Sequence, residues 1–154
     1  MDEAYIKQTI DEVLQHTGCT ISEYVFTEEG GIYWGSLTTP DSRFLIGKDG
    51  ETLRSFNHLV RKLVEKKFGE TVSAALFIDI NGYQKKYFDG IRTTAHMLAE
   101  RARYFKSTIE AEPMPAFERR IMHMFLENAK DIQTESKGEG KDRRLTIKYV
   151  GDII

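Results

Sequence analysis

The sequence contains no long hydrophobic run, since no stretch approaches the roughly 18 apolar residues of a membrane-spanning helix. Cys19 is the only cysteine among 154 residues, which excludes an internal disulfide framework and a metal site built from several cysteines. The first residues, MDEAYIKQTI, lack the basic start and the apolar segment of a secretory signal. We therefore expect a cytoplasmic protein with no membrane span.

The sequence also has no overall excess of positive charge, with 22 lysines and arginines against 24 acidic residues. The formal net charge is −2, which is unfavourable for a protein that binds nucleic acid. The charges are unevenly distributed, however: residues 1–41 carry one basic and eight acidic side chains, whereas residues 42–70 carry seven basic and four acidic ones. We therefore expect any phosphate-binding surface to lie after residue 41 and not in the acidic front of the chain.

The composition supports a packed core, because hydrophobic residues make up 40% of the chain and charged residues 30%. No repeat, low-complexity tract or long Gly/Ser linker divides it, so we expect two small units that abut. Hydrophobic periodicity and turn residues predict the elements. They are, in order, a helix over 3–16, strands over 19–26 and 31–39, a short turn of helix, a helix over 53–68, a strand over 72–80, a long helix over 87–105, an extended segment over 108–115, a helix over 117–132, a polar loop over 133–142 and a strand over 143–150.

The stretch FLIGKDGETL places two glycines around a Lys-Asp pair at residues 47–50. Glycine at both ends lets the backbone turn tightly and brings amide N–H groups close to a ligand phosphate at the start of the following helix. Lys48 adds a cation, and we expect Ile46 and Leu53 to line an apolar groove suited to base faces. Taken alone, Gly-x-x-Gly also fits an ordinary surface turn, and it lacks the spacing of a P-loop.

The context of this motif resembles a type II KH domain over residues 1–82. The Ile-Gly-x-x-Gly-x-x-Leu pattern stands between a predicted hairpin and a helix–strand pair, after an N-terminal helix. The resemblance implies an α+β fold of order α-β-β-α-α-β, with helices on one face of a three-stranded sheet. It also implies that Gly47, Lys48, Asp49 and Gly50 clamp the backbone of about four single-stranded nucleotides. The negative charge of Asp49 would repel a phosphate, and the positive charge of Lys48 offsets this repulsion.

A second motif, ERRIMH, places Arg119 and His123 four residues apart on a predicted helix. At 100° per residue, these two side chains and Lys130 share the helix face opposite the apolar stripe. A charged helix face of this kind is commonly exposed to solvent and has no binding function. Alternatively, a planar arginine fork and a stackable histidine ring form a platform for phosphate and base.

Arg-x-x-x-His is the signature of the R-three-H domain, which binds single-stranded nucleic acid. With the return segment TESKGEGKDRR, the chain resembles the bacterial Jag (SpoIIIJ-associated, KhpB-like) family, in which a type II KH domain precedes a small α/β R-three-H domain, here over residues 83–154. Many members carry an extra N-terminal Jag domain, whereas this sequence begins at the predicted KH helix. Ser136, Gly138 and Gly140 lie in the return segment, and the RNA-binding residues predicted for this domain are Arg119, His123, Lys130, Lys137, Lys141, Arg143 and Arg144.

The favoured hypothesis is a non-catalytic protein that binds single-stranded RNA, or alternatively single-stranded DNA, without cofactor or metal. The resemblance implies post-transcriptional control linked to cell division or envelope growth, and a small partner that consists of a KH domain alone. One alternative is a docking adaptor that uses the acidic N-terminal helix. Another is a nuclease with His123 as base and Arg119 as phosphate clamp. The sequence shows neither paired carboxylates nor a His/Cys cluster with metal-ligand spacing.

Overall fold

The computed structural model describes residues 1–151 and forms two compact units, Met1–Lys85 and Lys86–Ile154. Each unit contains one three-stranded sheet with helices, which confirms the expected α+β class. The last residues of the predicted second domain, 152–154, lie outside the described part. No helix within residues 1–151 is both long and apolar enough to cross a membrane.

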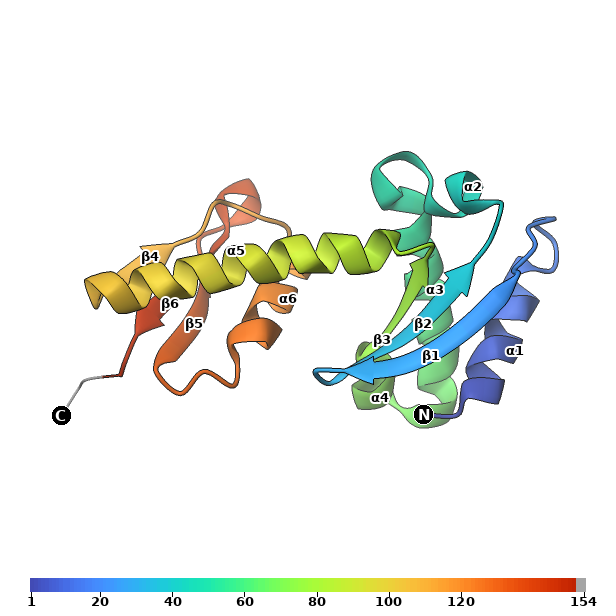
Figure 1. Ribbon diagram of the computed structural model, residues 1–154, viewed down its shortest axis with the longest axis horizontal. Helices are drawn as coiled ribbons and strands as arrows, with labels where there is room; N and C mark the ends of the chain where they lie inside the picture. The colour runs from blue at the N-terminus through green and yellow to red at the C-terminus, as the bar shows by residue number, and fades with distance from the viewer. Residues whose placement is uncertain (152–154) are drawn as a thin grey trace. The chain divides into compact units, whose positions relative to one another are not determined.

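The first unit alternates helices with the strands of a mixed sheet. Its elements are α1 (Glu3–Leu14), β1 (Glu23–Glu29), β2 (Ile32–Thr38), α2 (Ser42–Ile46), η1 (Lys48–Gly50), α3 (Glu51–Phe68), α4 (Glu70–Ala74) and β3 (Leu76–Ile80). The strand order is β1-β2-β3, with β1 antiparallel and β3 parallel to β2 (Figure 1). The strand predicted over 72–80 is wrong at its start. There the amide of Ser73 donates to the carbonyl of Gly69, and the chain forms the short helix α4 before β3.

The core of this unit lies between the sheet and the two helices α1 and α3, which cover one of its faces (Figure 1). A buried polar side chain joins α3 to β3, the strand at one edge of the sheet. Asn57 donates to the carbonyl of Ile78 (2.9 Å) and accepts from the amide of Ile78 (2.7 Å). The Asn57 amide thus satisfies backbone groups that an edge strand leaves unpaired, which fixes the helix against the sheet.

The second unit is built on a sheet in which both strand pairs are antiparallel. Its elements are α5 (Tyr83–Phe105), which begins in the first unit, β4 (Thr108–Glu110), α6 (Ala116–Leu126), β5 (Ile132–Lys137), η2 (Gly140–Asp142) and β6 (Arg144–Tyr149), in the strand order β4-β6-β5. The helix predicted over 117–132 ends earlier, at Leu126, and the predicted loop over 133–142 contains β5. The polar side chains of β5 do not show the hydrophobic pattern from which a strand is predicted, because only Ile132 in β5 is buried.

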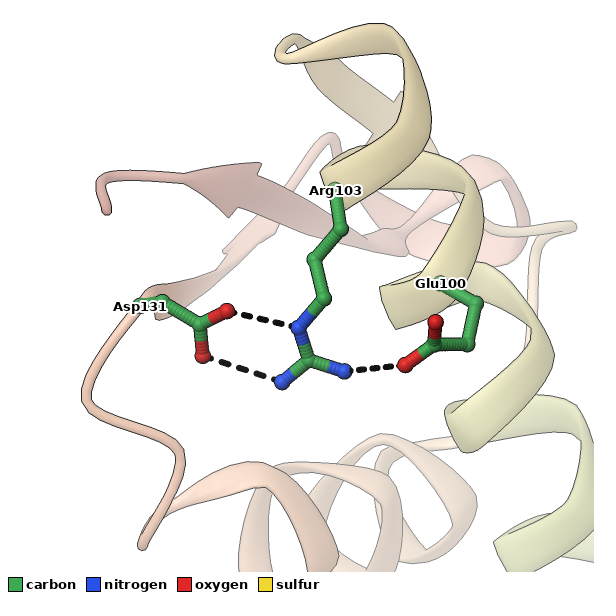
Figure 2. A network of polar contacts seen from close by, with 3 residues as sticks. All are labelled: Glu100, Arg103 and Asp131. Carbon is green, nitrogen blue, oxygen red and sulfur yellow. Dashed lines mark hydrogen bonds and ion pairs between the residues drawn. The ribbon is translucent and has the colours of Figure 1, made fainter. Parts of the chain in front are cut away.

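An ion-pair network ties the end of α5 to the turn before β5 (Figure 2). The guanidinium of Arg103 makes two bonds to the carboxylate of Asp131, at 2.6 Å from Nε and 2.9 Å from Nη2. Its Nη1 contacts Glu100 at 2.5 Å. The parallel two-bond geometry holds both partners in one orientation, so the network fixes where β5 begins.

This network makes the stability of the fold depend on pH. The hydrogen bonds from Arg103 lower the pKa of Asp131 from its usual 3.8. A pKa depressed in the folded state contributes stability above the unfolded pKa, and that contribution is lost as pH falls through the folded pKa. We therefore expect Arg103→Met to destabilise the protein at pH 7 and to do so less at about pH 3.

Urea unfolding at both pH values measures this difference. Arg101→Met is the matched control, since Arg101 is an exposed arginine of the same helix. If Arg103→Met costs the same free energy of unfolding at both pH values, the ion pair with Asp131 is not the source of its effect.

Candidate nucleic-acid interface

The glycine loop, residues 47–50, has a backbone that requires glycine at both ends. Gly47 (φ 72°) and Gly50 (φ 74°) lie in the left-handed half of conformational space, and the Gly50 amide donates to the Gly47 carbonyl at 3.4 Å. A β-carbon at Gly47 would stand 2.1 Å from Oγ1 of Thr52, and one at Gly50 would stand 2.9 Å from the ring of Tyr83. Both the conformation and the lack of space therefore exclude larger side chains.

The two residues between the glycines project outward. Lys48 and Asp49 are both exposed, and Asp49 has a positive φ of 51°. Arg54, on the first turns of α3, donates to the backbone carbonyl of Asp49 at 3.0 Å. Arg54 therefore braces the loop and adds a cation beside Lys48. Arg54 is not among the RNA-binding residues predicted from the sequence, although a basic residue one turn into the helix was the available signal.

The apolar residues around the loop differ from the expectation. Ile46 is half-buried against the core, and Leu53 has no exposed surface. The expectation that Leu53 lines an open groove is wrong, because the apolar stripe of α3 turns it into the core. The exposed apolar side chain next to the loop is instead Phe44, which is 64% exposed.

In the second unit, Arg119 and His123 stand over a shared hollow. Arg119 donates through Nη1 to the carbonyl of Met114 (2.5 Å), just before α6, and the Nδ1 atom of His123 hydrogen-bonds the hydroxyl of Thr134 on β5. The hollow has a volume of about 370 Å³. It is lined by Ala116, Arg119, Arg120, His123, Thr134, Glu135, Ser136 and Leu145. One turn of α6 and one strand thus bring the two signature residues together.

Arg143, directly after η2, hydrogen-bonds Ser136, a residue that lines the hollow. Its Nε donates to Oγ of Ser136 at 3.1 Å, and its carbonyl accepts from the amide of Met114 at 3.2 Å. Arg120, which is not among the residues predicted from the sequence, also lines the hollow. It follows Arg119 directly, so the pair of arginines was the available signal.

The other predicted basic residues are placed differently. Lys130 lies beyond the end of α6, so the expectation that it shares a helix face with Arg119 and His123 is wrong. Lys137 forms an ion pair with Glu135 at 3.7 Å, and Arg144 forms one with Glu110 at 3.5 Å. Lys141 is exposed in η2, and the structure records no contact between it and the hollow.

No metal-binding geometry accompanies these residues in the described part of the chain. Within residues 1–151, no group of three or more histidine, cysteine, aspartate and glutamate side chains is arranged to hold a metal ion. Glu118, the acidic residue next to Arg119, instead accepts a hydrogen bond from the hydroxyl of Tyr87.

Comparison with known proteins gives a family for the second unit and relatives for most of the chain. Residues 91–149, which include Arg119 and His123, match the R-three-H domain. The chain is 34% identical over 112 residues to the RNA-binding protein KhpB of Clostridium symbiosum, and 31% identical over 115 residues to that of Bacillus subtilis (strain 168). It is 25% identical over 112 residues to that of Lactiplantibacillus plantarum.

These matches cover 73% of this chain but 50%, 54% and 34% of the three relatives, so the chain spans about half the length of the first two. Residues 91–149 include the geometry described above, in which Arg119 and His123 stand one helical turn apart over one hollow and His123 contacts a strand hydroxyl. Residues 91–149 therefore match the R-three-H domain, and the chain is similar over 73% of its length to the KhpB RNA-binding proteins.

Proposed function

We propose that this protein binds single-stranded RNA without catalysis, through the hollow around Arg119 and His123 and through the glycine loop. The observation that carries the proposal is the meeting of Arg119 and His123 over one hollow within the R-three-H domain. The relatives are named as RNA-binding proteins, which favours RNA over DNA as the ligand.

The hollow offers complementary groups for a nucleotide. Of the guanidinium donors of Arg119, Nη1 is engaged by the Met114 carbonyl, which orients the fork and leaves its other N–H groups for a phosphate. The exposed ring of His123 is held by Thr134, so it stands ready to stack on a base or to donate a hydrogen bond. Arg143, anchored on Ser136, adds a second cation for the strand backbone.

The glycine loop serves as the second contact, within a type II KH domain over residues 1–82. The order of helices and strands in the first unit and the glycine requirement of the loop support this assignment. Lys48 and Arg54 supply positive charge, and the open backbone lets phosphates approach the amide groups. The resemblance to the Jag family extends the proposal to post-transcriptional control of division or envelope growth, in the cytoplasm and with a KH-only partner.

The binding proposal is tested by the salt dependence of RNA affinity. The loop and the cations of the hollow together neutralise roughly four to six phosphates, which predicts a slope of about −3 to −4 in log affinity against log salt. Fluorescence anisotropy with a labelled single strand measures it. A slope near zero contradicts the proposal, since it would mean that these basic residues do not contact the backbone.

The alternatives give different results in simple assays. A nuclease that used His123 as base would shorten labelled RNA in the presence of Mg²⁺ and would lose that activity in His123→Ala. A docking adaptor that used the acidic α1 would retain its protein partner after ribonuclease treatment. The proposal expects intact RNA in the first assay.

His123 is expected to contribute mainly through its flat ring. We expect His123→Ala to weaken RNA binding by about fivefold or more, since stacking on a base contributes roughly 1–3 kcal/mol. His123→Phe keeps a ring but loses the bond to Thr134, and should retain more affinity than the alanine variant. Equal losses in the two variants, measured by the same anisotropy titration, would assign the role to hydrogen bonding instead.

A further inference from the structure

Tyr83, the first residue of α5, lies against the second glycine of the loop. A β-carbon at Gly50 would stand 2.9 Å from Cε1 of Tyr83 and 3.0 Å from its hydroxyl oxygen. The ring therefore occupies the space that a side chain at position 50 would need. Tyr83 nevertheless remains 39% exposed, so part of its surface faces solvent beside the loop.

A buried carboxylate holds the backbone around Tyr83 in place. Asp79, at 2% exposure, accepts hydrogen bonds from the amides of Gly82 (2.9 Å), Gln84 (2.6 Å) and Lys85 (3.2 Å). These amides belong to the turn before α5 and to its first residues, which have no partner within the helix. Asp79 thus caps the helix on both sides of Tyr83 and holds the backbone that carries its ring.

The turn before α5 is fixed by a second interaction. Asn81, with a left-handed φ of 49°, donates through Nδ2 to the carbonyl of Thr39 and accepts at Oδ1 from the amide of Thr39, both at 2.9 Å. Two polar side chains, Asp79 and Asn81, therefore fix the segment that carries Tyr83. An aromatic residue whose backbone is fixed before the ligand arrives loses less conformational entropy on binding than one on a mobile loop.

We propose that Tyr83 is a nucleotide-contacting residue of the loop, whose ring stacks on the base of a nucleotide held by its backbone at residues 47–50. This inference rests on the proposed function and adds a base contact to a loop that otherwise offers backbone amides and cations. Single-stranded RNA is the ligand with the matching chemistry, since its bases stack on aromatic rings while its phosphates meet Lys48 and Arg54.

Two variants separate stacking from simple filling of space beside Gly50. Tyr83→Phe keeps the ring and should bind RNA within about twofold of wild type, whereas Tyr83→Leu fills the space without an aromatic face and should bind about fivefold to 100-fold more weakly. Tyr104→Leu is the matched control, because Tyr104 is an 83% exposed tyrosine at the other end of α5. Urea unfolding of each variant confirms that the fold is kept.

A spectroscopic readout makes the test independent of affinity. Tyr83→Trp places an indole beside the loop, and the one native tryptophan, Trp34, is only 4% exposed. RNA should quench the emission of the new indole as bases stack on it. Absence of quenching at saturating RNA, or wild-type affinity in Tyr83→Leu, overturns the inference alone. If the wild-type protein shows no salt-dependent RNA binding, the proposed function fails and the inference fails with it.

Discussion

Lys48→Asp is expected to weaken binding of single-stranded RNA by about 30-fold. The substitution makes both residues between the glycines acidic. It replaces one attraction of about 1 kcal/mol at 4 Å in water by a repulsion of similar size, which is enough to release this contact. Both positions are exposed and the glycines that set the loop remain, so the fold should be unaffected. Anisotropy with a labelled strand of about twenty nucleotides measures the loss.

The matched control for this variant is Lys66→Asp. Lys66 is an exposed lysine in the last turn of α3, so the control makes the same change of charge in the same unit but away from the glycine loop. We expect it to lower RNA affinity only slightly. A Lys48→Asp protein that is folded and binds RNA as tightly as the wild type would remove the loop from the interface.

The second large effect concerns RNA length. If one strand engages both the glycine loop and the hollow at Arg119 and His123, the second contact becomes intramolecular and affinity rises by about 100-fold or more. We expect this gain between RNAs of about five nucleotides and RNAs of about ten or more. Arg119→Ala should abolish the gain in the full-length chain and leave a protein whose affinity barely changes with length.

The same measurements at different RNA lengths also show whether the two sites fail to share one strand. If Arg119→Ala binds long RNA as tightly as the wild type, the hollow at Arg119 and His123 does not share the strand with the loop. The docking-adaptor alternative would then be favoured for that half of the chain. Urea unfolding of the variant controls for stability, because Arg119 also orients the segment before α6 through Met114.

The sequence predicted the features that depend on local pattern. The apolar periodicity of residues 53–68 predicted the helix α3, and the glycines at 47 and 50 predicted a tight turn. The structure has both features. The pairing of Arg119 with His123 follows from their spacing of one helical turn. What the spacing does not show is the strand that meets them, since Thr134 and Ser136 lie in a segment expected to be a loop.

The predictions that were wrong concern secondary structure and burial that depend on tertiary contacts. β5 is polar in composition, and its pairing with β6 makes it a strand where local propensity predicts a loop. The sequence pattern around Leu53 is compatible with a residue that lines a groove and with a residue of the core. Only the packing of α3 on the sheet shows that Leu53 belongs to the core. The contact between Tyr83 and Gly50 joins residues far apart in sequence, through a turn set by Asp79, and no local pattern predicts it.

Ultraviolet crosslinking of the full-length chain to a uridine-rich single strand, followed by identification of the crosslinked peptides, tests the central claim most directly. We predict two groups of crosslinked peptides, one containing the glycine loop at residues 47–50 and one containing Arg119 and His123. Both groups should weaken in high salt, because the contacts depend on phosphate neutralisation. Crosslinks confined to the acidic residues 1–41, or yields unchanged in a Lys48→Asp/Arg119→Ala double variant, would contradict the account.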